Sequence, residues 1–271
     1  MEIIFNNVTI VKNRGTNFQK TIINDFSLSF KSNIINCLCG NGGKTTIAKS
    51  ILALENITDG EIHVGDFIIN KSAFIRNIKK LRSSVSYLGK DPRTFLYHKT
   101  VKKEIMFGFN PATNMTILEV LSLVGLNESY LKKDPLKLSL TEQKKVCLAS
   151  IIAFNPKIII LDEFEKGLTK YEKKELKRIL KDLKTKLDKT IVIISNDVTF
   201  IHNFCEYFYC LSDGKLVLTG DKEIFNNKEF YKYTNEPNII EFVNYLNSRG
   251  IKMPNYIEPK ELLKAVYRDV G

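Results

Sequence analysis

A glycine-rich turn that ends in a lysine is the strongest chemical signal in the chain. Glycines let successive backbone N–H groups approach a phosphate chain closely, and a helix that follows them adds a partial positive charge at its N-terminus. Lys44 would then reach the outer phosphates, and the Thr45 hydroxyl would hold Mg²⁺. The candidate phosphate-binding residues are Gly40, Asn41, Gly42, Gly43, Lys44, Thr45 and Thr46. The alternative is a turn that merely joins a strand to a helix.

The spacing of this turn departs from the usual phosphate loop. The pattern G-x-x-x-x-G-K-[ST] places a glycine six residues before the lysine, where this chain has Leu38. The turn therefore looks one residue short. Either the loop is truly shortened, which would change the shape of the phosphate cradle, or the numbering hides a missing residue.

An acidic pair, Asp162 and Glu163, follows the apolar run 157–161. At the carboxyl end of a parallel strand an aspartate can hold Mg²⁺, and a neighbouring glutamate can polarise the water that attacks a γ-phosphate. Alone, such a pair would more often cap a helix. Together with the turn at Lys44, it predicts a nucleotide-binding site, with Thr45 and Asp162 as Mg²⁺ ligands and Glu163 as a catalytic residue.

The elements that must position these residues can be read from the hydrophobic pattern. Short β-rich segments at 1–11 and 21–30 predict a small antiparallel sheet. Continuous apolar runs at 34–39, 157–161 and 190–194, joined by helical segments, predict a parallel sheet covered on both faces. The region from 92 to about 135 is loop and helix, and the pattern from 221 onward is helical and polar.

Composition agrees with a folded chain of about two domains. The 271 residues are 44% apolar and 26% charged, which excludes wholesale disorder and fibrous repeats. We find no spanning segment or cleavable leader and expect a cytoplasmic or peripheral membrane protein. The five cysteines lack paired C-x-x-C spacing, so we expect reduced thiols, with Cys37 and Cys39 facing opposite sides of their strand.

The formal net charge of +11 suits nucleic acid, anionic lipid or a polyanionic ligand. The densest basic stretch, 170–189, carries a helical stripe of apolar residues, namely Leu176, Ile179, Leu180, Leu183 and Leu187. Its lysines are therefore better explained as the solvated face of a helix, and we expect no nucleic-acid partner.

These elements, in this order, resemble the nucleotide-binding subunits of ATP-binding cassette (ABC) transporters over about residues 1–220. Between the loop and the acidic pair that family carries L-S-G-G-Q at the start of a helix, and residues 138–142 here read LSLTE. The resemblance implies a P-loop (RecA-like) α/β fold with a mostly parallel sheet, an antiparallel β subdomain and a helical subdomain at about 92–150. It also implies that the signature residues act on a partner's site; they are Ser139, Leu140, Thr141 and Glu142.

The C-terminal residues point to one subgroup of this family. Residues 225–266, with FVNYLNSRGIKMP and EPKELLKAV, are similar to the C-terminal helical extension of ATPases from energy-coupling factor (ECF) transporters, which predicts an extension over 221–271. In that subgroup two ATPase subunits dimerise beneath a transmembrane coupling subunit, together with a substrate-binding membrane subunit. The resemblance implies a peripheral protein on the cytoplasmic face of the membrane that uses ATP to drive uptake of a vitamin or metal ion.

Several positions depart from the family pattern. Lys90 occupies the position of the Q-loop glutamine, which the resemblance places among the ATP-binding residues. A lysine is a cation and would compete with Mg²⁺ there. Asn196 occupies the position of the switch histidine and is the second candidate catalytic residue. An asparagine can donate a hydrogen bond, but it cannot exchange a proton near neutral pH. Leu140 and Thr141 replace the two signature glycines. Lys12 stands where an aromatic residue usually stacks on adenine, with Phe18 as a possible substitute, and Thr169 replaces an aspartate.

Two hypotheses follow from these substitutions. The chain is either a working ATPase with an impaired site of its own, or a nucleotide-binding scaffold that pairs with a competent partner; the substitutions favour a heterodimer. A non-transport ABC protein is a third option. In the transporter hypothesis residues 91–109 dock on a membrane subunit, with Phe95, Leu96 and Tyr97 as candidates for apolar contacts, although burial of these side chains is an equal alternative.

Overall fold

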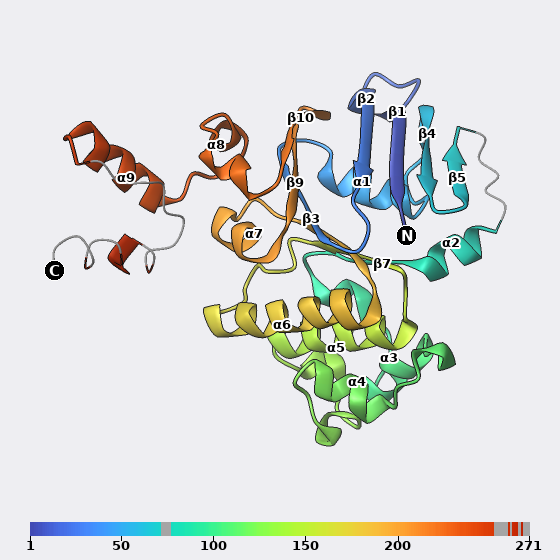
Figure 1. Cartoon of the computed structure of the whole chain (residues 1–271). Coiled ribbons are helices and arrows are strands. Elements are labelled where there is room, and N and C mark those ends of the chain that lie inside the picture. The colour runs from blue at the N-terminus through green and yellow to red at the C-terminus, as the bar shows by residue number, and fades with distance from the viewer. Residues whose placement is uncertain (72–76, 252–259, 261, 265–266, 268–271) are drawn as a thin grey trace.

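Two β-sheets and a group of helices beside the larger sheet make up the computed structural model of the protein (Figure 1). The structure describes residues 1–71, 77–251, 260, 262–264 and 267. It has the α/β fold that the sequence predicted, with one antiparallel sheet and one mostly parallel sheet. The proposed boundary at residue 220 stays a prediction.

The smaller sheet has four antiparallel strands in the order β2-β1-β4-β5. Its strands are β1 (Ile3–Lys12), β2 (Lys20–Phe30), β4 (Asp59–Val64) and β5 (Phe67–Asn70). In β2 the buried side chains of Phe26, Leu28 and Phe30 alternate with exposed ones, as expected for a sheet with one face on the core. The sequence predicted β1 and β2 but missed the short hairpin of β4 and β5.

The larger sheet has six strands in the order β10-β9-β3-β8-β7-β6, and all neighbours are parallel except β10 and β9. The strands are β3 (Ile35–Gly40), β6 (Val85–Leu88), β7 (Ile158–Asp162), β8 (Thr190–Ile194), β9 (Tyr207–Ser212) and β10 (Lys215–Gly220). Every residue of β3, β7 and β8 is buried because the sheet is covered on both faces. The continuous apolar runs of the sequence predicted this burial.

Different helices cover the two faces of the larger sheet. Helix α1 (Lys44–Ile51) lies between the two sheets and packs on Ile158, Ile160 and other residues of one face. The opposite face, with Ile159 and Leu161, packs on the helical group shown in the lower part of Figure 1. The remaining helices of the globular part are α2 (Ile78–Ser84), α3 (Val101–Phe107), α4 (Ile117–Leu123), α5 (Leu140–Phe154), α6 (Lys170–Leu187) and α7 (Val198–Phe204).

The apolar stripe of α6 is buried as the sequence predicted. Leu176, Ile179, Leu180 and Leu183 are all buried in the main core. The lysines on the other side of α6 are exposed or form ion pairs such as Lys173–Asp197 and Lys184–Glu206. The lysines of α6 therefore belong to one face of an amphipathic helix, whereas Lys189, beyond the end of α6, is buried.

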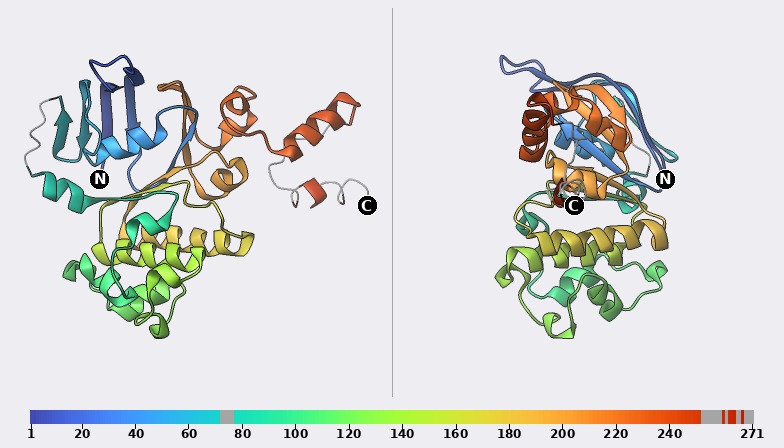
Figure 2. Two further views of the ribbon diagram at one scale, coloured as in Figure 1. Left: turned by 180° about the vertical axis from the view of Figure 1, so that it is seen from behind. Right: turned by 60° about the vertical axis from the view of Figure 1, so that its left-hand side comes forward.

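The C-terminal helices α8 (Phe230–Tyr233) and α9 (Asn238–Ser248) follow the last strand, and α9 stands away from the sheets in both Figure 1 and Figure 2. Ile240 and Val243 are its buried residues. The predicted extension over 221–271 is helical as far as the structure describes it, and much of the stretch from 252 to 271 lies outside the described residues. No helix in the described part of the chain is long and apolar enough to span a bilayer.

The expectation for Cys37 and Cys39 was wrong. Both thiols lie in the main core beside the helices, whereas Leu38 between them faces the other core. Residues two apart on a strand share a face, so both sulfurs point the same way. Both are buried reduced thiols, and burial contributes to raising the pKa of each.

Gly40 at the end of β3 offers a direct test of how tightly the turn is packed. Gly40 has φ +90°, and a Cβ there would lie 2.0 Å from the backbone oxygen of Leu211. Gly15 has a similar φ of +78°, but a Cβ there would meet nothing within 4 Å. We predict that Gly40→Ala lowers the free energy of unfolding by at least about 2 kcal/mol more than Gly15→Ala, because only the first adds a clash to the backbone strain. Urea unfolding of both variants measures this difference, and equal losses would contradict it.

Candidate functional site

The glycine turn leaves a helix N-terminus open toward the carboxyl edge of the large sheet. Three residues, 41–43, join β3 to α1, and Gly42 and Gly43 have φ of +77° and +88°. The first helical hydrogen bond runs from the Ile47 N–H to the Gly43 carbonyl at 2.8 Å, and no side chain caps the helix. The N–H groups of the first helical turn therefore remain available for an anion.

One amide of the turn is already bound. The Asn41 N–H donates to the Leu211 carbonyl at 2.8 Å and so anchors the turn to β9. The Asn41 N–H therefore helps to fix the position of the glycine turn and is not one of the donors available to a phosphate. The Lys44 ammonium, for its part, donates to the Gly40 carbonyl.

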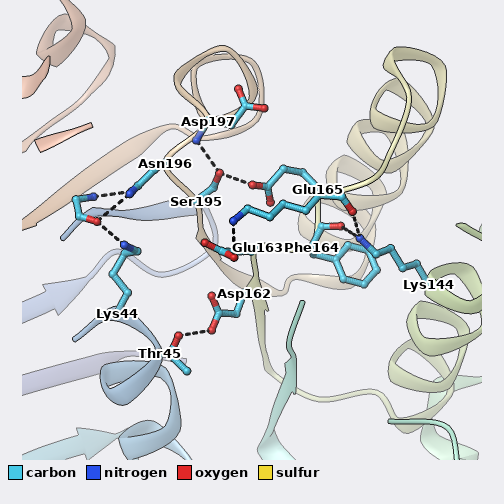
Figure 3. Close-up of polar contacts among 12 residues, drawn as sticks. Lys44, Thr45, Lys144, Asp162, Glu163, Phe164, Glu165, Ser195, Asn196 and Asp197 are labelled. Carbon is cyan, nitrogen blue, oxygen red and sulfur yellow. Dashed lines mark hydrogen bonds and ion pairs between the residues drawn. The ribbon is translucent and has the colours of Figure 1, made fainter. Parts of the chain in front are cut away.

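Asp162 meets the start of α1 through a hydrogen bond. The Thr45 hydroxyl donates to Asp162 Oδ2 at 2.7 Å (Figure 3), and the Tyr87 hydroxyl of β6 donates to the same oxygen at 2.9 Å. Burial and the nearby Asp162 charge raise the pKa of Tyr87, so this hydroxyl keeps its proton. A hydroxyl and a carboxylate on adjacent elements, oriented by a second hydroxyl, fit Mg²⁺, which binds few protein oxygens and takes the rest from phosphates and water.

Glu163 follows Asp162 in a left-handed backbone conformation with φ +50°. Its N–H donates to the Ile194 carbonyl of β8 at 2.9 Å, which ties the turn after β7 to the neighbouring strand. Its carboxylate is partly exposed and forms an ion pair with Lys166 at 2.6 Å. The sequence did not predict this partner.

Asn196 lies beside the glycine turn. Its Oδ1 accepts from the Gly40 N–H at 2.8 Å, and its Nδ2 donates to the Gly40 carbonyl at 3.0 Å (Figure 3). Both ends of the amide therefore bind a single residue of β3. The structure brings Asn196 to the site, in contact with the turn itself.

A buried carboxylate that the sequence did not point out lies next to these residues. Glu165 is 3% exposed, and its Oε1 accepts from the Ser195 hydroxyl at 2.6 Å. Its Oε2 has no hydrogen-bond partner among the residues that the structure describes. Burial raises the pKa of Glu165, and the bond from Ser195 opposes that shift. The only sequence signal for it was its place two residues after Glu163.

The turn after β7 opens onto a cavity of about 520 Å³. Residues 163 and 165–168 line one side, residues 196–199 at the start of α7 line another, and residues 235–237 before α9 close a third. Glu163 and Asn196 thus face a shared space at the carboxyl edge of the sheet. Ligands of open α/β sheets bind at this edge.

The sequence family described as "ABC transporter" matches residues 23–166 of the chain. The energy-coupling factor transporter ATP-binding protein EcfA2 of Streptococcus agalactiae is 31% identical over 98% of this chain and 99% of its own length. The chain belongs to the ABC transporter ATP-binding proteins. EcfA2 of Staphylococcus aureus is 29% identical over 84% of this chain and 83% of its own length.

Solved structures support the fold of this ABC transporter ATP-binding protein. The cbiO1 protein of Clostridium perfringens, described as part of the ABC transporter complex cbiONQ, matches with a TM-score of 0.71 and 21% identity over 91% of this chain and 94% of that one. The ATP-binding cassette MJ0796, in a dimer bound to ADP and Pi, matches with a TM-score of 0.70 and 22% identity over 81% of this chain and 98% of that one. The ABC ATPase fold predicted from the motifs is confirmed.

The ABC signature segment begins helix α5 in this chain. Ser139 is the N-cap, with its hydroxyl accepting from the Glu142 N–H while Glu142 accepts from the Ser139 N–H at 2.9 Å. The Tyr130 hydroxyl also donates to Glu142 at 2.6 Å, and these bonds lower the pKa of Glu142. Leu140 is 42% exposed and Thr141 is partly buried, so the two substituted positions lie at the surface of the helix start. Their predicted role toward a partner stays a prediction.

Other ABC positions singled out from the sequence lie at the edges of the site. Lys90 is exposed, two residues after β6. Lys12 pairs with Glu55 at 2.9 Å, and Phe18 is 81% exposed in the loop between β1 and β2. For Leu96 the structure shows the second of the two alternatives, burial in the main core, whereas Tyr97 is 77% exposed.

The pKa of Glu165 predicts how stability depends on pH. Because this pKa is raised in the folded protein, folding favours the protonated carboxyl, and wild-type stability falls as pH rises through the folded-state pKa. We predict that Glu165→Gln gains thermal stability relative to wild type as pH increases from about 4 to 8, where each kcal/mol appears as about 2–4 °C in Tm.

Differential scanning calorimetry across this pH range measures the effect. Glu241→Gln, at an exposed glutamate of α9, is the matched control for the loss of one carboxylate. A Glu165→Gln difference that does not change with pH would contradict the prediction.

Proposed function

We propose that the chain is the ATP-binding subunit of an ECF-type ABC transporter and that it binds MgATP between the glycine turn and the end of β7. The contact of Thr45 with Asp162 carries this proposal, because it places the expected phosphate cradle and the expected metal carboxylate against each other. The similarity to the EcfA2 proteins over nearly the whole chain supports the transporter class.

Each residue of the site then has a defined function. The N–H groups at the start of α1 and the Lys44 ammonium bind the phosphates, and Thr45 and Asp162 hold Mg²⁺. Bound Mg²⁺ would neutralise phosphate charge. Glu163, which directly follows Asp162 at the end of β7, would polarise the attacking water.

Hydrolysis at this site should be slow. Asn196 cannot exchange a proton as histidine does, and both ends of its amide already bind Gly40. Lys90 adds a cation where the family has a neutral amide, and Glu163 is paired with Lys166. These features support a heterodimer in which a sister ATPase subunit supplies an intact signature segment and hydrolyses ATP faster. They equally favour the second candidate, a nucleotide-binding scaffold with little turnover of its own.

The membrane partners are a transmembrane coupling subunit and a substrate-binding membrane subunit, and the solute is a small molecule such as a vitamin or metal ion. Within residues 91–109 the exposed apolar side chains are Tyr97, Met106 and Phe107. We propose that these side chains dock on the coupling subunit, which would place the chain at the cytoplasmic face of the membrane.

Purification of the tagged chain from membranes, followed by a single-turnover ATPase assay of the isolated complex, tests the proposal. Glu163→Gln keeps the size of the side chain but removes its charge, so we expect an order of magnitude or more of the hydrolysis at this chain's own site to be lost, about 10²-fold for a general base. Glu229→Gln, at an exposed ion pair of α8, is the matched control and should behave as wild type.

The outcomes separate the two candidates. A lower rate with unchanged nucleotide binding supports a working site on this chain. An undiminished rate would mean that catalysis resides on the partner and that this chain is the scaffold.

A further inference from the structure

Lys166 forms the closest polar contact of the Glu163 carboxylate that the structure describes. Its ammonium lies 2.6 Å from Glu163 Oε2, and both side chains line the cavity beside Asn196. The pair is not buried, since the Lys166 side chain is 50% exposed and that of Glu163 is 32% exposed. Both charged groups of the pair are therefore accessible to solvent.

The backbone fixes the distance between the two residues. The Lys166 N–H donates to the Glu163 carbonyl at 3.2 Å, and the Leu168 N–H donates to the Glu165 carbonyl at 3.1 Å, which closes two successive turns. Glu163 is also held by its N–H bond to Ile194 and by its left-handed φ of +50°. The two side chains consequently start from fixed positions on the same side of one tight turn.

A second lysine binds the backbone of this turn from the protein interior. Lys144 of α5 is 1% exposed, and its ammonium donates to the Phe164 carbonyl at 2.5 Å and to the Lys166 carbonyl at 2.6 Å. Figure 3 shows Lys144 reaching the turn from the helix that starts with the signature segment. Burial lowers the pKa of Lys144, and the nearby Glu165 opposes that shift. Because a buried cation without acceptors is costly, these carbonyls are held in place.

The charges around Lys166 explain why it remains at this carboxylate. Its hydrogen bond to Glu163 raises the pKa of Lys166, and Glu165 and Asp162 add to that effect. The ammonium therefore stays charged at physiological pH. At 2.6 Å the ammonium also occupies Oε2 of the Glu163 carboxylate, so this oxygen must release Lys166 before it can bind a water molecule.

We propose that Lys166 is a positioning residue that holds Glu163 as an ion pair and so restrains its action as the base for ATP hydrolysis. This inference rests on the proposed function of Glu163. It assigns the slow hydrolysis of this site in part to a residue of the chain itself, three positions beyond the carboxylate. Removal of the Lys166 charge should therefore accelerate the chemical step without changing nucleotide affinity.

The test compares Lys166→Met, which keeps the length of the side chain without its charge, with Lys166→Arg, which keeps the ion pair. Lys174→Met, on the exposed side of α6, controls for the loss of one positive charge. Steady-state ATP hydrolysis by the membrane-purified complex gives kcat and KM for each. We expect Lys166→Met to raise kcat by about 3- to 10-fold with KM changed by less than about twofold, and both other variants to match wild type.

Two further measurements keep the result specific. In a Glu163→Gln background, Lys166→Met should give no gain, since the base that it releases is absent. Thermal unfolding should show that Lys166→Met folds as wild type does, because an exposed ion pair adds little to stability.

An unchanged or lower kcat for Lys166→Met would overturn the inference, as would a rise in KM, which would mean that Lys166 binds the phosphates. Fluorescence titration with a labelled ATP analogue separates the two failures. Wild-type protein that binds no nucleotide contradicts the proposed function, whereas normal binding without faster hydrolysis contradicts only the role of Lys166.

Discussion

The hydrogen bond from the Thr45 hydroxyl to Asp162 is the contact on which the organisation of this site depends. It joins the first turn of α1 to the end of β7, although β8 separates β3 from β7 in the sheet. Asn196, just after β8, binds both backbone polar groups of Gly40 at the end of β3, and the Glu163 N–H binds the Ile194 carbonyl of β8. The ends of three adjacent strands are thereby linked into one surface, at the edge where open α/β sheets bind ligands.

Three lysines near this surface bind carboxylates or backbone carbonyls, which the net charge of the chain does not predict. Lys144 is buried and binds backbone carbonyls, Lys166 pairs with Glu163, and Lys173 pairs with Asp197. Part of the excess positive charge is therefore used to pair with two carboxylates and to bind the backbone of the turn after β7. Such ion pairs contribute modestly to stability when exposed, so their main effect is on the position and reactivity of the carboxylates.

The sequence predicted the parts of the fold that depend on local pattern. Continuous apolar runs identified β3, β7 and β8, because residue type and order suffice for buried strands, and the glycine turn with its acidic partner led to the candidate site. The hairpin of β4 and β5 was missed since its strands are short. Docking and burial of Leu96 stayed equally open in the sequence, because tertiary packing decides between them, and the structure buries it. Lys144, Glu165 and Lys166 were missed because their contacts join positions whose meeting depends on the folded turn after β7.

Hydrogen–deuterium exchange with and without a non-hydrolysable MgATP analogue tests the central claim most directly. The structure predicts slower exchange at the backbone amides of residues 42–46 and 162–163, because phosphates would accept from the first group and metal binding would hold the second. Exchange should stay unchanged in the hairpin of β4 and β5, which lies in the other sheet. Unchanged exchange at residues 42–46 under saturating analogue would contradict the account of this turn as a phosphate cradle.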